Sequence, residues 1–232
     1  MRAASVLVRA GARSTGYGAV RGLRNLSLAL LLAAGAAHAE TVTVAALGDS
    51  LTQGFGLPQQ DGFVPQLQAW LDAHGADVKL INAGVSGDTT AGGLSRVDWT
   101  LTPDVQAMIV ALGGNDLLRG IEPSVSKANL DGILAKAQAA GVKVLLVGLP
   151  GVGNYGPDYK AAFDGMFTEL AAKYHVPLYP DFFKGIEEAA GSMAKAGPLM
   201  QADGIHPNKQ GVADNVAAIG PAVLALVQSV GK

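Results

Sequence analysis

TVTVAALGDSLTQGFG, residues 41–56, joins a strand-like segment to a loop of a different character. Its first seven residues are apolar or β-branched, which is typical of a buried β-strand. The apolar run stops at Gly48-Asp49-Ser50, and a loop with spaced glycines follows. A small hydroxyl side chain therefore stands directly at the exit of a strand.

Four further apolar runs resemble this first one, and amphipathic stretches separate them. The strand-like runs cover residues 41–47, 78–83, 105–113, 142–150 and 176–179. The helix-like stretches cover residues 63–75, 90–101, 124–141, 158–175 and 208–230. Continuous apolar strands that alternate with helices indicate a parallel sheet covered on both faces. The sequence predicts a single α/β domain over residues 40–232, with three α/β/α layers and a five-stranded parallel sheet.

Residues 1–39 differ from the rest of the chain. They contain five arginines and no acidic residue, followed by the apolar segment LSLALLLAAGAA at 26–37 and the triplet Ala37-His38-Ala39. This order is typical of a secretory signal peptide, and it predicts cleavage after Ala39. The apolar segment is shorter than the roughly 20 residues that a membrane span needs, which argues against a permanent anchor. We expect a periplasmic or secreted protein.

The charge and composition of the chain indicate which kinds of molecule it can bind. The chain has 17 basic and 19 acidic residues, and loss of the five N-terminal arginines leaves a formal charge of about −7. A negative chain is a poor partner for nucleic acid or an anionic membrane surface. There is no cysteine, and the few histidines are scattered, so no zinc-binding cluster is expected. We expect a small-molecule substrate, with no metal and no organic cofactor.

The predicted sheet places Ser50 where ligands bind in parallel α/β folds, outside the carboxyl ends of the strands. A serine hydroxyl is a weak nucleophile until a base takes its proton. His74 and His175 each end a helix-like stretch just before a strand, which puts them at the opposite edge of the sheet. His206 precedes the last helix and is free to face the strand ends.

Asp203 lies three residues before His206 in the segment DGIHP. This spacing allows its carboxylate to orient the imidazole, as the acid does in a catalytic triad. A helix-capping aspartate beside a surface histidine would give the same pattern. Ser86, at the end of the next strand, is a second possible nucleophile, and the residue pattern alone leaves the choice with Ser50 open.

Acyl transfer also requires hydrogen-bond donors for the negative oxygen that develops on the substrate. The strand ends offer the backbone N–H groups of Ser50 and Gly87 and the side-chain amide of Asn115. Ordinary turns and helix caps would also use a glycine and an asparagine at these positions.

Together these residues resemble the SGNH (GDSL-type) hydrolase family, and within it the bacterial thioesterase I, arylesterase and lysophospholipase group. Four blocks occur in order over about residues 42–228: LGDSLTQGFGL, INAGVSGDTTAGGL, VALGGNDLLRG and DGIHPN. The resemblance implies a flavodoxin-like fold.

The resemblance also implies a role for each matched residue. Ser50 would be the nucleophile rather than Ser86, with His206 as base and Asp203 as its partner. Ser50, Gly87 and Asn115 would form the oxyanion hole. The segment from residue 149 to residue 156 matches the family's substrate-side loop, which makes Leu149, Pro150, Asn154 and Tyr155 candidate substrate contacts.

The expected function is an exported serine esterase for carboxylic esters or thioesters, including aryl esters, short to medium acyl esters and lysophospholipids. A carbohydrate acetyl esterase or a specialised phospholipase of the same family is an alternative. Two hypotheses outside the family also use these residues. Asp49, Asp88 and Asp116 near the strand ends could serve a metal-dependent phosphotransfer domain, although no P-loop is present. An exported binding domain could use the same cleft without catalysis.

Overall fold

A computed structural model describes residues 41–231 of the chain. The predicted signal peptide, residues 1–39, lies outside the described residues. The sheet contains five parallel strands in the order β2-β1-β3-β4-β5. They are β1 (Val42–Gly48), β2 (Val78–Gly84), β3 (Ala107–Ala111), β4 (Lys143–Val147) and β5 (Leu178–Tyr179). The predicted parallel α/β sheet is confirmed.

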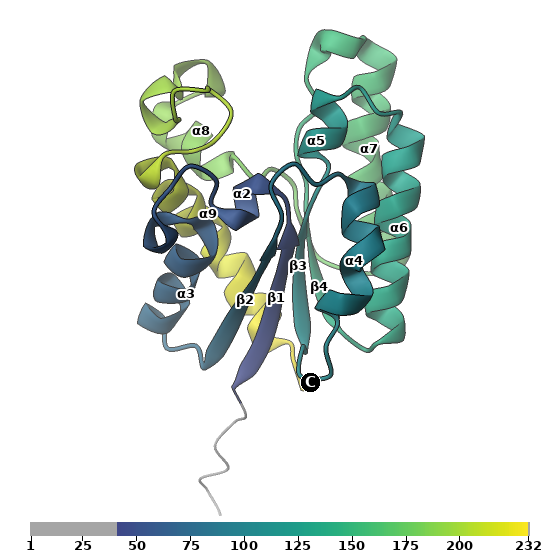
Figure 1. Cartoon of the computed structure of the whole chain (residues 1–232), viewed down its shortest axis with the longest axis vertical. Helices are drawn as coiled ribbons and strands as arrows, with labels where there is room; N and C mark the ends of the chain where they lie inside the picture. The colour runs from purple at the N-terminus through teal and green to yellow at the C-terminus, as the bar shows by residue number, and fades with distance from the viewer. Residues whose placement is uncertain (1–40, 232) are drawn as a thin grey trace, which may run out of the picture. The chain divides into compact units, whose positions relative to one another are not determined.

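Helices cover both faces of this sheet (Figure 1). One layer contains α3 (Phe63–Ala73) and α9 (Lys209–Gln228), with α8 (Lys184–Ala190) packed on α9. The other layer contains α4 (Thr90–Thr100), α6 (Pro123–Ala139) and α7 (Pro157–Tyr174). The helices of each layer pack side by side, so the predicted three-layer α/β/α arrangement is confirmed.

The alternation of side chains along each strand divides the core into two halves. On β1, Ala45 and Leu47 join the half packed under α4, α6 and α7. Val44 and Ala46 join the half packed under α3 and α9. All four side chains are at most 1% exposed. From Val44 to Leu47 the strand is apolar at every position, because each of its faces carries a helical layer.

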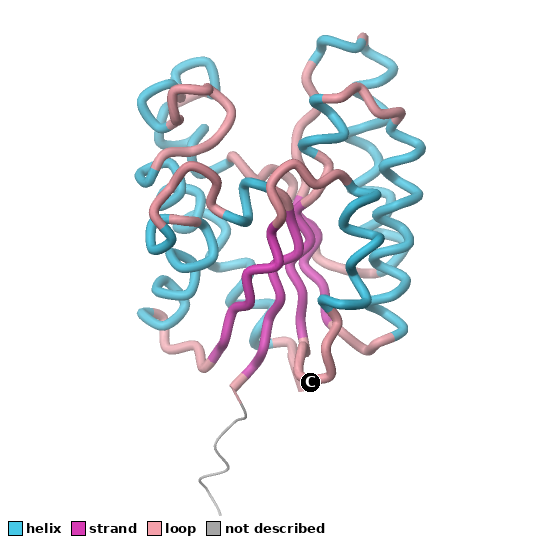
Figure 2. Tube along the Cα trace, in the orientation of Figure 1, coloured by secondary structure: helices cyan, strands magenta, loops and turns pink. Residues whose placement is uncertain are grey.

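The carboxyl ends of the central strands lie level with one another. Gly48 at the end of β1 pairs with Gly84 on β2 and with Ala111 on β3. The loops that follow these strands gather at one end of the molecule (Figure 2). The short helices α2 (Ser50–Gln53) and α5 (Gly114–Leu118) begin there.

Two features of the fold depart from the sequence prediction. The strands β3, β4 and β5 are shorter than their apolar runs. Residues beyond the strand ends, such as Leu112 after β3 and Leu149 after β4, are apolar because they also pack against the core. The edge strand β5 lies between Pro177 and Pro180, which have no N–H to donate to a strand partner. The helices α2, α5 and α8 were not predicted, because four to seven residues show too little periodicity.

Within residues 41–231, α9 is the helix that is long and apolar enough to cross a membrane by length and composition. Half of its most apolar window is buried inside the protein. It packs against α3, β3 and β4. Its apolar character is therefore accounted for by its place in the core.

Candidate active site

Ser50 is the first residue of α2, directly after β1. Asp49 caps this short helix, because its Oδ1 atom accepts a hydrogen bond from the backbone N–H of Leu51 at 3.0 Å. The end of β1 is tightly enclosed. A Cβ atom added at Gly48 would lie 2.9 Å from the carbonyl oxygen of Ala111. The Ser50 hydroxyl therefore projects from a helix start that is fixed against the sheet.

His206 lies in the loop before α9 and faces Ser50. Its Nε2 atom is 2.8 Å from Ser50 Oγ, although the two residues are 156 positions apart in sequence. The other ring nitrogen, Nδ1, is 2.7 Å from Asp203 Oδ2. The ring of Phe55 lies against the imidazole, with centroids 4.7 Å apart. Ser50, His206 and Asp203 thus form a continuous hydrogen-bonded chain.

Asp203 is held by the backbone of its own turn. Its Oδ1 atom accepts hydrogen bonds from the N–H groups of Ile205 and His206, at 2.9 and 3.0 Å. These bonds, with that to the His206 ring, lower the pKa of Asp203 to about 2. An ionised carboxylate accepts from Nδ1–H, which leaves Nε2 to accept the serine proton.

The other two candidate bases and the other candidate nucleophile make different contacts. His74 ends α3, where its Nδ1 atom is 2.7 Å from the carbonyl of Trp70. His175 ends α7 in the left-handed region, with φ of 53°. The Ser86 hydroxyl donates to Gln53 Oε1 at 3.0 Å. Among the described residues, the structure therefore pairs His206 with Ser50 and with no other serine.

Gly87 and Asn115 line the same cleft as Ser50. Gly87 has a φ of 81°, a conformation that favours glycine. The Asn115 amide donates to the carbonyl of Asp88 at 2.9 Å, and its Nδ2 atom is 3.4 Å from Asp49 Oδ2. A contact of 3.4 Å is at the long limit for a hydrogen bond, so the amide keeps donor capacity for a substrate oxygen.

Asp49 is a buried carboxyl group next to Ser50 in the chain. The residue is 3% exposed, and burial raises the pKa of its carboxyl to about 6. The Leu51 N–H, the charge of His206 when it is protonated and the Asn115 amide oppose this rise.

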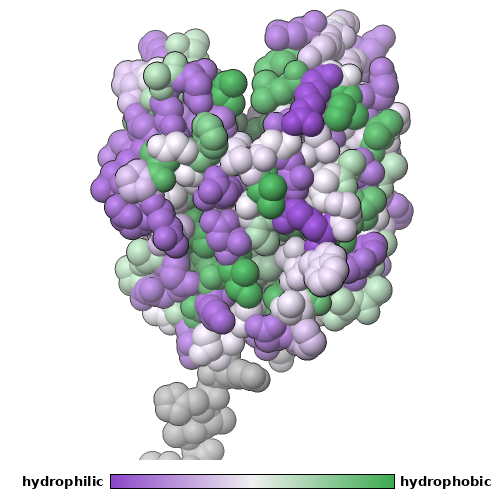
Figure 3. Space-filling view, in the orientation of Figure 1, coloured by the Kyte–Doolittle hydropathy of each residue, from purple (hydrophilic) through white to green (hydrophobic). Residues whose placement is uncertain are grey.

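The cleft above these groups has a volume of about 560 Å³. Figure 3 shows apolar residues on both sides of the hollow between the two helical layers. Leu149 and Pro150 line this cleft, whereas Asn154 and Tyr155 do not. The Tyr155 hydroxyl instead donates to the carbonyl of Leu118 at 3.3 Å, and Leu118 is one of the residues that line the cleft.

Several lining residues were not found from sequence. The apolar ones include Phe55, Leu118, Val152, Met193, Met200 and Ile205. They come from separate segments of the chain, and no periodic pattern connects them. A second cavity of about 560 Å³ opens at the amino ends of β4 and β5. Its Ser229 hydroxyl donates to its own helix at Leu226, 2.7 Å away.

The three carboxylates of the phosphotransfer hypothesis are engaged by separate protein donors. Asp49 accepts from Leu51, Asp88 pairs with Arg96, and Asp116 accepts from Thr90. Among residues 41–231, no group of three or more histidine, aspartate or glutamate side chains is arranged to hold a metal ion.

Comparison with known proteins agrees with this geometry. Residues 46–213 match the GDSL-like Lipase/Acylhydrolase family. Esterase TesA of Pseudomonas aeruginosa is 42% identical over 181 residues, which cover 78% of this chain and 86% of the relative. Thioesterase 1/protease 1/lysophospholipase L1 of Escherichia coli strain K12 is 34% identical, with 78% and 81% covered.

Among solved structures, AlinE4, an SGNH-hydrolase family esterase, matches with a TM-score of 0.66 and 41% identity. The match covers 81% of this chain and 97% of AlinE4. The family predicted from the four sequence blocks is therefore confirmed. This chain belongs to the GDSL-like lipase/acylhydrolase family and is a serine ester hydrolase with the SGNH fold.

Proposed function

We propose that this protein hydrolyses carboxylic esters and thioesters through an acyl-enzyme formed on Ser50. The observation that carries the proposal is the chain of contacts from Ser50 Oγ to His206 Nε2 at 2.8 Å and from His206 Nδ1 to Asp203 at 2.7 Å. This is the arrangement by which a base activates a serine hydroxyl.

In the first half of the reaction, Ser50 Oγ attacks the substrate carbonyl carbon while His206 Nε2 takes the serine proton. Negative charge develops on the carbonyl oxygen, where the N–H groups of Ser50 and Gly87 and the amide of Asn115 are the proposed donors. His206 then gives the proton to the leaving alcohol or thiol. The acyl group remains on Ser50.

In the second half, water replaces the leaving group. His206 takes a proton from the water, the resulting hydroxide attacks the acyl carbon, and the carboxylic acid leaves as Ser50 recovers its proton. The ionised Asp203 stabilises the histidine cation that forms in both halves. Apart from the substrate and water, every step uses groups of this chain.

Aryl esters and short to medium acyl esters are the proposed substrates, with lysophospholipids as a further class. The cleft of about 560 Å³ supports this proposal, because its walls are largely apolar and Leu149 and Val152 line it together with Ser50. An acyl chain or an aromatic ring fits such a wall better than a polar sugar does.

The test is a series of p-nitrophenyl esters of increasing chain length, with the wild type and the variants Ser50→Ala and Ser86→Ala. Ser86 is the matched control, since it lines the same cleft and bonds to Gln53 instead of a histidine. We expect Ser50→Ala to lose hydrolysis and Ser86→Ala to retain it. Acid quenching followed by mass spectrometry should find the acyl group on the peptide that contains Ser50. Undiminished activity in Ser50→Ala would refute the mechanism.

We further propose that the protein is exported to the periplasm or the medium, and that cleavage follows Ala39. The arginine-rich start, the apolar segment and the Ala37-His38-Ala39 triplet support this proposal. The mass of the protein recovered outside the cytoplasm tests it, since the mature chain should begin at Glu40. Recovery of the full-length chain in the cytoplasm would contradict it.

A further inference from the structure

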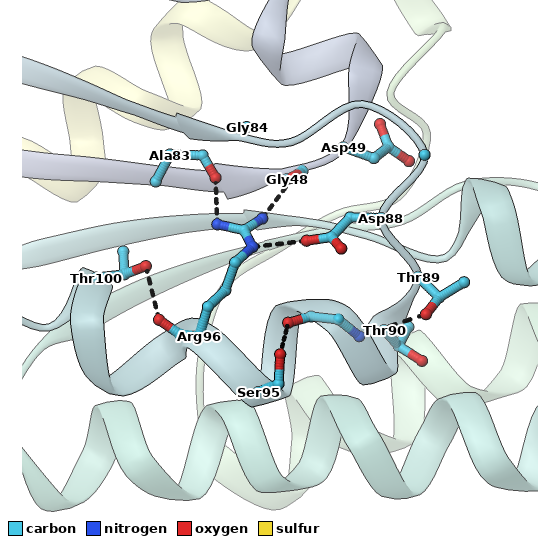
Figure 4. A network of polar contacts seen from close by, with 12 residues as sticks. Gly48, Asp49, Ala83, Gly84, Asp88, Thr89, Thr90, Ser95, Arg96 and Thr100 are labelled. Carbon is cyan, nitrogen blue, oxygen red and sulfur yellow. Dashed lines mark hydrogen bonds and ion pairs between the residues drawn. The ribbon is translucent and has the colours of Figure 1, made fainter.

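Arg96 lies on α4, outside the catalytic chain, yet its guanidinium reaches three segments that meet at the strand ends. Nε is 2.6 Å from Asp88 Oδ2, Nη1 donates to the carbonyl of Ala83 at 2.7 Å, and Nη2 donates to the carbonyl of Gly48 at 2.8 Å. Figure 4 shows the guanidinium facing the carbonyls of Ala83 and Gly48 and the carboxylate of Asp88. The Arg96 side chain is 21% exposed.

Each of these contacts adjoins a group of the proposed active site. Gly48 lies two residues before the nucleophile Ser50. Ala83 is the next-to-last residue of β2, just before the loop that contains Gly87. Asp88 follows Gly87 directly. One side chain therefore connects the segment that carries the nucleophile with the segment that carries an oxyanion donor.

Asp88 also connects these segments with Asn115, in the helix α5 that follows β3. Its carboxylate pairs with Arg96, and its backbone carbonyl accepts the Asn115 amide at 2.9 Å. The position of Asp88 thus affects both proposed donors outside α2, the N–H of Gly87 and the amide of Asn115. A Cβ atom added at Gly92 would lie 2.0 Å from Asp88 Oδ1, so α4 leaves room for this carboxylate.

The chemistry of the contacts requires arginine in particular. A planar guanidinium offers N–H groups in fixed, diverging directions, whereas a lysine ammonium is a single point of charge. Charge-assisted bonds to a carboxylate and to two carbonyls restrict all three segments at once. Oxyanion donors stabilise a transition state only if they are already in place when the charge develops.

We propose that Arg96 and Asp88 form a positioning pair that sets the oxyanion donors Gly87 and Asn115 relative to Ser50. This inference rests on the proposed function, because it concerns the transition state of that reaction. The pair touches no substrate, and it acts on the reaction only through the loops that it holds.

The test compares Arg96→Gln, Arg96→Lys, Asp88→Ala and Asp88→Asn with wild type. The control pair is Asp98→Asn and Lys136→Gln, an ion pair of 2.5 Å between α4 and α6 that is away from the strand ends. For each variant, kcat and KM for one p-nitrophenyl ester, the pH profile of kcat/KM and the melting temperature are measured. Rates are taken well below the lowest melting temperature.

We expect Arg96→Gln and Asp88→Ala to lower kcat by about 10²-fold, comparable to the loss of one oxyanion donor. KM should change by less than about threefold, because the interaction is made in the transition state only. The pH profile should keep its midpoint, since the Ser50–His206 contact is untouched. Asp88→Asn keeps an acceptor for Arg96 and should recover most of the rate, whereas Arg96→Lys should recover little. The control variants should retain wild-type kcat.

The double variant Arg96→Gln/Asp88→Ala should lose no more than about the larger single loss, because the two residues act as one unit. If the Arg96 variants do not fold, the pair Asp88→Ala and Asp88→Asn tests the same point. A wild-type kcat in folded Arg96→Gln and Asp88→Ala, with only a lower melting temperature, would overturn the inference. Ser50→Ala keeps the two proposals apart: an active Ser50→Ala refutes the mechanism, whereas an inactive Ser50→Ala with unimpaired Arg96 variants refutes the positioning pair alone.

Discussion

Replacement of Asp49 by asparagine should change how the stability of the protein depends on pH. Burial raises the Asp49 pKa from its ordinary value of 3.8 to about 6. The protonated group is therefore favoured in the folded state over a range where the unfolded chain is ionised. The difference between the two values corresponds to about 3 kcal/mol of folding free energy.

The direction in which stability changes with pH follows from proton binding to Asp49 in the folded and unfolded states. Below 3.8 both states hold the Asp49 proton, and the group costs no stability. As the pH rises from 3.8 to about 6, the unfolded chain releases this proton first, so the free energy of unfolding falls. Above about 6 both states are ionised, and the loss stays at about 3 kcal/mol. An asparagine at this position has no proton to release and escapes this loss.

The assay is urea unfolding of wild type and Asp49→Asn at a series of pH values, followed by circular dichroism. We expect the free energy of unfolding of Asp49→Asn minus that of wild type to increase by about 2 kcal/mol between pH 4 and 7. The offset at pH 4 reflects the contacts of the new amide with Leu51 and Asn115, so only the change with pH is diagnostic. Asp77→Asn, away from the core, is the control and should run parallel to wild type. Parallel curves for Asp49→Asn as well would refute the assignment of a raised pKa to this carboxyl.

Further predictions concern Asp203, Gly48 and the metal hypothesis. Asp203→Asn should lower kcat by roughly 10⁴-fold in initial-rate assays, because the amide no longer selects the imidazole tautomer that accepts the serine proton; a loss below about tenfold would contradict this role. Since the pKa of Asp203 is about 2, protonation of this group should cause no loss of wild-type activity between pH 4 and 7. Gly48→Ala should destabilise the protein by about 1–3 kcal/mol, because its Cβ would lie 2.0 Å from Thr52 Oγ1 and 2.9 Å from the Ala111 carbonyl; Gly197→Ala, with nothing within 4 Å, is the control for the melting temperatures. Dialysis against EDTA should leave ester hydrolysis unchanged, because Asp49, Asp88 and Asp116 bond to protein donors; activity that is lost and then restored by added metal would show otherwise.

The contact between His206 and Ser50 was predictable from sequence because the fold class restricts where each histidine can lie. His74 and His175 end helices that lead into strands, which places them at the amino edge of a parallel sheet. That reasoning left His206, and the structure brings it to Ser50 at 2.8 Å. The choice of Ser50 over Ser86 came from the resemblance to the family, because both residues follow strands.

Other residues of the site could not be predicted from the sequence pattern. Arg96 appears there as one basic residue on an amphipathic stretch, and its contacts depend on where the carbonyls of Gly48 and Ala83 arrive after folding. Met193 and Met200 reach the cleft from irregular segments that have no strand or helix period. Tyr155 stays a candidate substrate contact because of the loop it belongs to, and its hydrogen bond to the Leu118 carbonyl is a contact that the sequence pattern did not predict.

Each proposed catalytic group taken from a strand end is adjacent in sequence to an aspartate: Asp49 precedes Ser50, Asp88 follows Gly87, and Asp116 follows Asn115. These aspartates do not converge on a common ligand, and each accepts hydrogen bonds from a different neighbour. Asp116 is fully buried and accepts from the N–H and hydroxyl of Thr90 at 2.8 and 2.6 Å.

An aspartate beside each of these groups compensates for the flexibility of the glycine-rich loops that carry them. Glycine allows the backbone to approach a substrate closely, yet it leaves the loop with more conformational freedom than any other residue would. A carboxylate next to each reactive group restores the lost restraint through charge-assisted bonds, without filling the space that the substrate needs. The raised pKa of Asp49 is the energetic cost of placing such a carboxylate in the core. If the three aspartates hold the groups beside them in place, their substitution should reduce kcat more than it weakens substrate binding.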